Sequence, residues 1–332
     1  VAMAGISTVG TRPEYRRQGL VRKIMTRAFA EQRERGQSIA GLWASQAAIY
    51  QRYGFAPAGA LREYRVDTTD IRLLMDSDDL PVQRFEGVEA FEAVRALYKD
   101  FIAQRTGYLH RSKSLWLNNV FAPPVEDGPV YVALVGSVSA PTGYVVYTLR
   151  AQRVQHRARA QEIRIRDLAW LDRSAYAALW QYLARHDLVG RVVWSTAPMD
   201  DPAPDLFIEP RLLHAQDLEG TWWRLVDVPA ALAQRGYDTE GVLVLGIAED
   251  DLAPWNVGNW RIEYSREGAA VQTTRAPADV NLSVRALSSL YSGYSVARHL
   301  ANAQLITADD AALAQFDRMM RTRFAPHCPD HY

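Results

Sequence analysis

The sequence has little of what would place it in a specialised class of protein. Its single cysteine, Cys328, excludes an internal disulfide, and we expect a reducing compartment such as the cytoplasm. Lysine plus arginine and aspartate plus glutamate number 38 each, so the formal net charge is zero. Because proteins that bind phosphate backbones usually carry a basic excess, this balance argues against nucleic acid as the main ligand.

Long apolar runs are missing as well. Near-continuous stretches such as 241–248 are far shorter than the roughly 20 residues that span a bilayer, so no membrane partner is expected. The first residues lack the pattern of a signal peptide, and the sequence does not begin with Met. Apolar residues make up 48% and charged residues 23%, which is typical of a globular protein.

The length predicts two or three domains, and the composition favours three, over residues 1–66, 67–215 and 216–332. Strands and helices alternate in the first of these. In its long helix, apolar residues recur at helical spacing, as one wide stripe. The elements expected there are strands at 1–9, 38–45 and 61–66 and helices at 19–35 and 47–53, with the stripe made by Leu20, Val21, Ile24, Met25, Ala28 and Phe29.

The two later domains also mix helices and strands, so we expect an α/β fold with mixed sheets. In the second domain these are helices at 87–106 and 172–186 and strands at 130–138, 143–150 and 162–170. In the third they are strands at 222–226, 241–248, 259–265 and 269–274 and helices at 284–291, 296–303 and 307–324.

The loop before the first long helix has the features of an anion site. The first N–H groups of a helix have no internal partner and carry the positive end of its dipole. Gly19 removes a side chain where a pyrophosphate would approach, and Arg16, Arg17 and Arg22 add positive charge. If the R-x-x-G pattern is considered alone, the alternative to an anion site is an ordinary basic helix start that is exposed to solvent. A second match at Arg33–Gly36 lies at a helix end and shows how weak the bare pattern is.

The wider pattern resembles a known family. P-E-Y-R-R-Q-G-L at 13–20 follows a V-x-T strand and resembles the acyl-CoA motif R/Q-x-x-G-x-G/A of the GNAT acetyltransferases. I-Y-Q-R-Y-G-F at 49–55 resembles their Y-x-x-x-G-F motif. Val21 departs from the pattern, since Gly or Ala stands there in the family, and its bulk should crowd the packing of the helix on a phosphate.

Within that family the sequence is similar to the enhanced intracellular survival (Eis) type. W-W-R-L-V-D-V-P-A-A-L at 222–232 and P-W-N-x-G-x-W-R at 254–261 resemble the signatures of its sterol-carrier-like third domain. The resemblance implies a GNAT domain, a degenerate second GNAT-like domain and a sterol-carrier-like C-terminal domain. It also implies a homohexamer. No R-x-x-G-x-G/A run follows any strand of the second domain, so that domain is expected to bind no CoA and to act as scaffold and substrate wall.

A GNAT domain normally has about three strands and one or two helices before the phosphate strand. We therefore expect the sequence to begin inside the first domain, and the natural chain to be longer by some tens of residues.

The resemblance implies acetyl-CoA as cosubstrate and assigns its contacts. The strand before the loop would bind the pantetheine and the thioester carbonyl, the helix start would bind the pyrophosphate through main-chain N–H groups, and the end of the next strand would line the channel. These positions are Val9, Gly10 and Thr11, then Arg17, Gln18, Gly19, Leu20, Val21 and Arg22, then Ser45 and Gln46.

Two residues are expected to be catalytic. Tyr50, four residues before Gly54 as in the family pattern, is the candidate acid for the leaving thiolate, with Tyr53 as its competitor. The base implied by the resemblance is the terminal carboxylate of Tyr332. A carboxylate with a pKa near 3.5 is a poor base for an ammonium unless burial raises that pKa or water relays the proton. A frayed terminus without a role is the alternative.

The expected reaction is direct transfer of acetyl from acetyl-CoA to a primary amine of a small polycationic molecule, aminoglycoside- or polyamine-like, or of a lysine. A polycation would suit an acidic cleft, for which three clusters are candidates: Asp76, Asp78 and Asp79; Asp200, Asp201 and Asp205; Glu249, Asp250 and Asp251. A carrier of lipids or other hydrophobic ligands with a vestigial acetyltransferase domain is the alternative.

Three further signals are interpreted structurally. His327, Cys328 and His331 lack a fourth ligand nearby, so no metal is expected. The arginines of 150–166 are expected on the wet face of a hairpin and not in an RNA site, because no aromatic residue lies among them. The third domain could enclose a cavity or a solid core, and we favour the core.

Overall fold

A computed structural model describes residues 1–74, 80–152 and 160–332. The chain forms two compact units: Val1–Ala60 with Glu219–Tyr332 (unit 1), and Leu61–Leu218 (unit 2). The first and third segments distinguished in the sequence therefore pack together. The mixed α/β class is confirmed by sheets that combine parallel and antiparallel strands.

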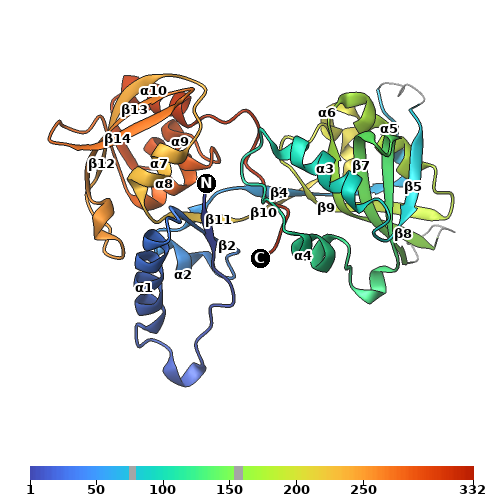
Figure 1. The fold of residues 1–332 in the computed structure, drawn as a ribbon, viewed down its shortest axis with the longest axis horizontal. Coiled ribbons are helices and arrows are strands. Elements are labelled where there is room, and N and C mark those ends of the chain that lie inside the picture. The colour runs from blue at the N-terminus through green and yellow to red at the C-terminus, as the bar shows by residue number, and fades with distance from the viewer. Residues whose placement is uncertain (75–79, 153–159) are drawn as a thin grey trace. The chain divides into compact units, whose positions relative to one another are not determined.

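The N-terminal part of unit 1 is built around a four-stranded sheet (Figure 1). Strands β1 and β2 run parallel, with α1 as their crossover. β11, which is more than 160 residues away in the sequence, lies between β2 and β3 and runs antiparallel to both. The elements are β1 (Met3–Gly5), the 3-10 turn Pro13–Tyr15, α1 (Leu20–Glu34), β2 (Ile39–Leu42), α2 (Ala47–Gln51), β3 (Ala56–Pro57) and β11 (Trp222–Leu225).

The rest of unit 1 is a five-stranded sheet in the order β14-β13-β12-β15-β16. A continuous apolar core that includes Leu245, Ile262, Leu287 and Phe316 joins this sheet to its helices. The elements are α7 (Val228–Gln234), β12 (Gly241–Ile247), β13 (Gly258–Ser265), β14 (Gly268–Thr274), β15 (Val280–Leu282), α8 (Val284–Tyr291), α9 (Ala297–Asn302), β16 (Ile306–Ala308) and α10 (Asp310–Met320).

Unit 2 is a seven-stranded sheet in the order β10-β4-β9-β8-β7-β6-β5, with helices on both faces (Figure 1). Strand alternation makes the two layers: Val132 and Leu134 pack in the cluster of α3, whereas Ala133 and Val135 pack in that of α5. The elements are β4 (Ala60–Asp67), β5 (Val82–Glu86), α3 (Phe91–Ile102), α4 (Lys113–Leu115), β6 (Val130–Ser137), β7 (Ala140–Ala151), β8 (Gln161–Trp170), α5 (Arg173–Ala184), β9 (Val189–Ala197), α6 (Ala203–Leu206) and β10 (Gln216–Glu219).

Several sequence predictions need correction. The strand expected over 1–9 ends at Gly5, because Thr8 turns into the left-handed region with φ 58°. The strand expected over 61–66 forms, but it pairs with β9 of unit 2 and not with the first sheet. The helix expected over 307–324 begins at Asp310, where the Asp309 carboxylate caps it, because residues 306–308 form β16.

The wide apolar stripe predicted for α1 is narrower in the structure. Met25 and Phe29 are buried, but Ile24 is 57% exposed.

Much of the arginine-rich 150–166 segment and the acidic cluster at 76–79 lie outside the described residues. Within the described ranges, no helix is both long and apolar enough to cross a membrane.

Candidate active site

The start of α1 is open to solvent. Gly19 is its N-cap residue, with φ 71° in the left-handed region that glycine adopts without strain. No side chain of the described residues caps the helix, and a Cβ at Gly19 would meet nothing within 4 Å. Unpartnered N–H groups and the positive end of the helix dipole face this opening, so its geometry suits an anion.

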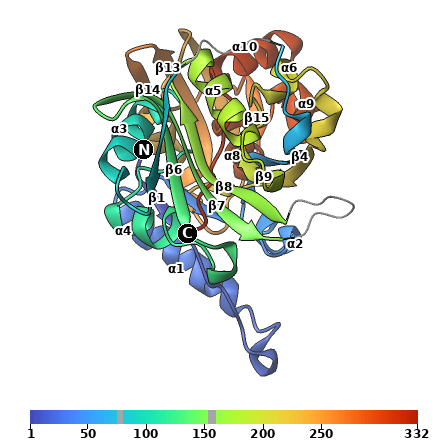
Figure 2. The same ribbon diagram turned by 90° about the vertical axis from the view of Figure 1, so that its right-hand side faces the viewer.

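The loop at 6–19 leads to this helix start and projects from its sheet (Figure 1 and Figure 2). Arg17 has a φ of 63°, a conformation that is costly for a residue with a Cβ and is found mainly where the surroundings or a function require it. Arg16 donates from Nε to the carbonyl oxygen of Thr11 (3.3 Å), which closes the turn between them.

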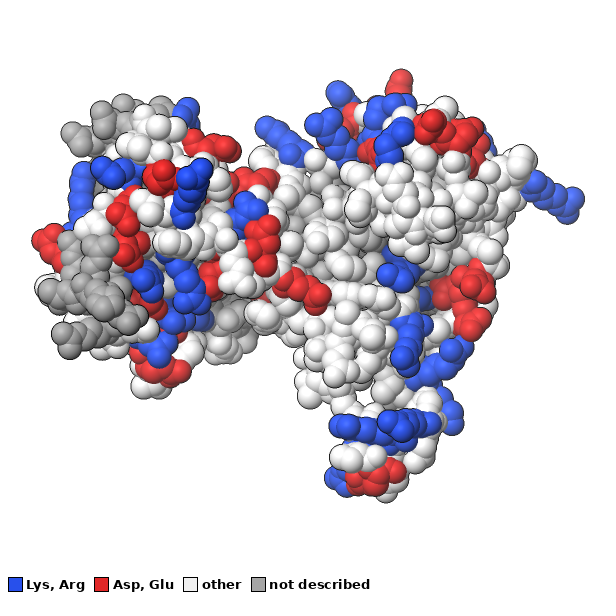
Figure 3. Space-filling view, turned by 180° about the vertical axis from the view of Figure 1, so that it is seen from behind, with Lys and Arg blue, Asp and Glu red and all other residues white. Residues whose placement is uncertain are grey.

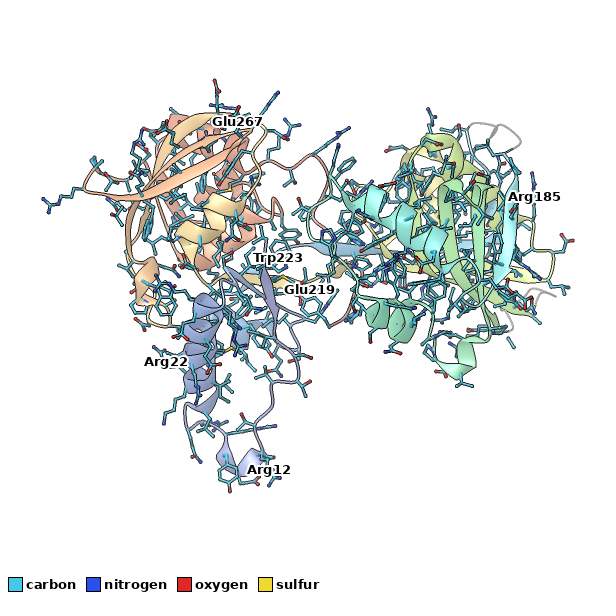
Figure 4. All side chains as sticks on the ribbon, in the orientation of Figure 1. Arg12, Arg22, Arg185, Glu219, Trp223 and Glu267 are labelled. Carbon is cyan, nitrogen blue, oxygen red and sulfur yellow. The ribbon has the colours of Figure 1, made fainter. Side chains whose placement is uncertain are left out.

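Basic side chains line this loop and α1, as the space-filling view shows (Figure 3). Figure 4 shows Arg12 at the far end of the loop and Arg22 on α1. Arg22 forms an exposed ion pair with Asp251 (Nη2 to Oδ2, 3.0 Å). Arg22, which is expected to bind the pyrophosphate, thus already contacts a carboxylate from the C-terminal part of unit 1.

Val9, Gly10 and Thr11 do not lie in a strand, contrary to the sequence prediction, because β1 ends before them. In the described chain, the last main-chain bond between the two parallel strands runs from the Ile6 N–H to the Gly41 carbonyl oxygen (2.8 Å). Beyond this bond the strands part, and the expected pantetheine residues belong to the loop.

Tyr50 is buried near the end of α2. Its ring stands edge-on to Phe55, with the centroids 6.1 Å apart, in a cluster that also holds Phe29 and Leu42. The Tyr50 carbonyl oxygen accepts from the N–H groups of Tyr53 (3.0 Å) and Phe55 (3.2 Å), which closes the 50–55 turn. Tyr53, the competing candidate, is half-buried on this turn.

Ser45 and Gln46 are exposed between β2 and α2, where Gln46 is the N-cap residue of α2. The strand expected over 38–45 ends at Leu42, so both residues lie in the connection that follows it.

The C-terminal tail, residues 326–332, is docked along the first sheet. His327 Nδ1 lies 3.4 Å from the Ala60 carbonyl oxygen, and the Trp43 indole N–H donates to the Asp330 carbonyl oxygen (3.0 Å). The His331 ring stacks on Trp43 with the centroids 3.9 Å apart. These contacts exclude a frayed tail.

Tyr332 lies where β1 and β2 begin to separate. Ideal Cβ atoms on Gly5 and Gly41, which pair in these strands, would lie 2.9 Å and 2.5 Å from atoms of its side chain. Its hydroxyl is 3.0 Å from Thr221 Oγ1, and burial raises the pKa of its phenol above the ordinary value. The two glycines thus leave room for the ring.

Tyr50 and Tyr332 approach the sheet from opposite faces. Successive side chains of a strand point to opposite sides. Ala40 and Leu42 pack in the cluster of Tyr50, whereas the Cβ direction of Gly41 points to Tyr332. The two side chains therefore lie on opposite faces of the β1–β2 pair.

In each acidic cluster that the structure describes, one carboxylate is buried and engaged inside the protein, whereas Asp200, Asp205, Glu249 and Asp251 are exposed. Asp201 accepts from the Tyr176 hydroxyl (2.7 Å), and Asp250 forms a buried ion pair with Arg224. Asp251 pairs with Arg22. In the described part of the chain, no group of three His, Cys, Asp or Glu residues is arranged to hold a metal ion.

Sequence reasoning missed the residues that fix the tail and the 50–55 turn. Trp43 and Thr221 hold the tail, and Arg224 binds the Tyr53 carbonyl oxygen (2.8 Å). The W-W-R motif contains Arg224, but as a domain signature it does not indicate which main-chain group the arginine binds.

Three models of protein families together match most of the chain. Residues 1–58 and 107–228 match two families of acetyltransferase (GNAT) domains, and residues 228–329 match the sterol carrier protein domain. A protein named as an uncharacterized N-acetyltransferase of Streptomyces coelicolor is 30% identical over 88% of this chain and 72% of its own length. The N-acetyltransferase Eis of Mycobacterium tuberculosis is 29% identical over 98% of this chain and 79% of its own.

Solved structures agree. The Eis1 protein of Mycobacterium abscessus superposes with a TM-score of 0.85 at 28% identity, over 99% of this chain and 82% of that one. A GCN5-related N-acetyltransferase of Anabaena variabilis gives a TM-score of 0.87 at 25% identity, with the same coverage. The chain belongs to the Eis-type N-acetyltransferases of the GNAT family, with a sterol-carrier-like domain at its C-terminal end.

Proposed function

We propose that this acetyltransferase moves the acetyl group of acetyl-CoA directly to a primary amine of a small polycationic molecule, aminoglycoside- or polyamine-like, or of a lysine. The observation that carries the proposal is the position of Tyr332 and Tyr50 on opposite faces of the sheet, where β1 and β2 part. The cofactor fits the chain, because GNAT enzymes use acetyl-CoA and the start of α1 is uncapped.

The pyrophosphate would bind the main-chain N–H groups at the start of α1, with Arg17, Gln18, Gly19, Leu20, Val21 and Arg22 around it. Arg22 would then exchange its exposed contact with Asp251 for the phosphate, at little cost because exposed ion pairs are weak. Val9, Gly10 and Thr11 would border the pantetheine, and Ser45 and Gln46 would line the channel at the end of β2.

In the reaction, the amine nitrogen attacks the thioester carbonyl carbon, the C–S bond breaks, and CoA leaves as a thiolate. The Tyr50 hydroxyl donates a proton to the sulfur from one face. The transfer accompanies C–S cleavage, because a phenol is a weaker acid than a thiol and protonation of a fully formed thiolate would be uphill. The Tyr332 carboxylate accepts the proton of the amine from the other face, directly or through water.

The decisive experiment follows CoA release from acetyl-CoA with a thiol reagent, using dialysed protein. Release that requires an added amine is expected, with the acceptors tested being a polyamine, an aminoglycoside and a lysine peptide. Tyr50→Phe should lower kcat by about 100-fold or more while acetyl-CoA still binds, because general acid catalysis contributes on that scale. Tyr53→Phe is the matched control and should change kcat by less than about threefold.

Two results would contradict the proposal. No release with any amine would favour the carrier alternative, and full turnover of Tyr50→Phe would remove Tyr50 from the mechanism. Adding one glycine after Tyr332 moves the carboxylate by about 3.5 Å. Full activity of that variant would exclude the carboxylate as base.

The resemblance also supports a cytoplasmic homohexamer. Sedimentation equilibrium should give six times the chain mass, and a monomer would contradict this part of the proposal.

A further inference from the structure

A buried arginine from the C-terminal part of unit 1 reaches the turn that carries Tyr50. Arg224 lies on β11, and its side chain is almost completely buried. Its Nη2 donates to both carboxylate oxygens of Asp250 (2.8 and 2.7 Å), and its Nη1 donates to the Tyr53 carbonyl oxygen (2.8 Å). One guanidinium therefore connects a buried carboxylate to the turn that follows α2.

The carboxylate is itself held in place. Asn256 Nδ2 donates to Asp250 Oδ2 (2.9 Å), while Asn256 Oδ1 accepts from the Val228 N–H (2.8 Å). Asn256 belongs to the P-W-N motif and Arg224 to the W-W-R motif. The two sequence signatures thus meet at one polar network of unit 1.

The network is fitted to the 50–55 turn. A Cβ on Gly54 would lie 2.1 Å from Arg224 Nη1, so this position requires glycine both for the close approach and for its φ of 80°. The Tyr53 carbonyl that Arg224 binds is three residues beyond Tyr50, whose own carbonyl accepts from the Tyr53 N–H.

A second path runs through rings. The Arg224 guanidinium lies over Phe29 at 4.4 Å, Phe29 packs on Phe55 with centroids 6.1 Å apart, and Phe55 meets the Tyr50 ring edge-on. Displacement of the guanidinium would therefore disturb Tyr50 through both its main chain and its ring.

A buried ion pair is a poor source of stability, because the cost of desolvating both charges offsets much of their attraction. The planar guanidinium of an arginine donates in fixed directions, so it is suited to holding the groups that it binds in a defined position. We propose that Arg224 is a positioning residue for catalysis, which holds the 50–55 turn so that the Tyr50 hydroxyl meets the leaving sulfur. This inference rests on the proposed role of Tyr50.

The test uses the whole chain and removes both charges at once. Arg224→Met with Asp250→Leu leaves no unpaired buried charge, so the fold is expected to persist. Its kcat should fall about 10- to 100-fold, since a displacement of about 1 Å in a catalytic group has effects of this size, while KM for acetyl-CoA changes less than threefold. Arg224→Lys, with Asp250 retained, keeps the ion pair and should have a kcat between those of the double variant and the original chain.

Arg235→Met is the matched control. Arg235 is also buried and donates to main-chain carbonyl oxygens, those of Tyr291, Met319 and Met320 among them, but these lie outside the 50–55 turn. Its melting temperature should fall without a change in kcat per folded enzyme.

A double-mutant cycle with Tyr50→Phe separates the outcomes. If Arg224 acts through Tyr50, adding Arg224→Met and Asp250→Leu to Tyr50→Phe should lower kcat no further. The inference would be overturned if Arg224→Met with Asp250→Leu lowered kcat by the same factor in the Tyr50→Phe background as in the original chain. It would also be overturned if this variant folded and its kcat were unchanged. Either result would leave the proposed function intact. Unchanged kcat in Tyr50→Phe alone would overturn both.

Discussion

Each unit contains two parallel strands joined by a helix, β1–α1–β2 in unit 1 and β8–α5–β9 in unit 2. The two segments differ at the start of the helix. In α1 the N-cap residue is Gly19, without a side-chain bond. In α5 it is Asp172, whose carboxylate accepts from the Ala175 N–H (2.8 Å).

This difference decides which helix start can bind an external anion. In α5 the protein's own carboxylate satisfies an orphan N–H and places negative charge where a phosphate would lie. In α1 the N–H groups are open and arginines surround them. The same topology thus gives an open helix start in unit 1 and a capped one in unit 2, depending on one cap residue.

The largest expected effect comes from transferring the α5 cap to α1. Gly19→Asp should weaken acetyl-CoA binding about 30- to 100-fold, which is about 2–3 kcal/mol, because its carboxylate repels the pyrophosphate and competes for the N–H groups. Gly19→Asn has nearly the same shape without the charge and should weaken binding less than about fivefold. Titration calorimetry measures both, and equal losses would contradict an electrostatic cause.

A second prediction concerns the internal carboxylates of unit 2. Burial raises the pKa of Asp201, which also accepts from the Tyr176 hydroxyl of α5, to about 7. A folded pKa above the ordinary value of 3.8 means that the stabilisation is fully present below that value and is lost as pH rises to about 7. The free energy of unfolding should therefore fall by about 2–3 kcal/mol from pH 5 to pH 8 through this group.

Asp201→Asn should reduce that pH dependence by the same amount in denaturant titrations at the two pH values. A variant with the pH dependence of the original chain would show that Asp201 is ionised throughout this range.

Removing the α5 cap is the converse of the first change. Asp172→Ala should cost about 1 kcal/mol and lower the melting temperature by about 2–4 °C. No second acetyl-CoA site should appear, because α5 has a single arginine at its start, Arg173, and lacks the glycine and the further arginines that flank the start of α1. Asp309→Ala removes the equivalent cap of α10 and serves as control. Binding of a second acetyl-CoA per chain by Asp172→Ala would break the comparison.

The smallest effect is expected at Val21, where the family pattern has a smaller residue. Val21→Ala should tighten acetyl-CoA binding about two- to threefold, since it removes bulk beside the pyrophosphate site. Ile24→Ala on the exposed side of the same helix should leave the dissociation constant unchanged. Unchanged or weaker binding by Val21→Ala would show that Val21 does not crowd the site.

Local signals in the sequence predicted much of this fold. Glycines 19 and 36 flank α1, and its predicted ends agree with the structure to within one residue. Helix α8 agrees at both ends. The position of Tyr50 before Gly54 also follows from local spacing, as does the anion-like helix start.

Long-range pairing was not predictable from the sequence. Nothing in W-W-R-L indicates that β11 enters the sheet between β2 and β3, because strand register between distant segments depends on the folded surroundings. The same holds for the Tyr332 ring on Gly5 and Gly41, and for the bond from Arg224 to the Tyr53 carbonyl. Each joins residues more than 160 positions apart.

Amide hydrogen exchange with and without CoA tests the central claim most directly. We expect the main-chain N–H groups at residues 19–22 to be protected on binding, with no change at residues 173–176. Protection at the start of α5, or binding of CoA without protection at the start of α1, would contradict it.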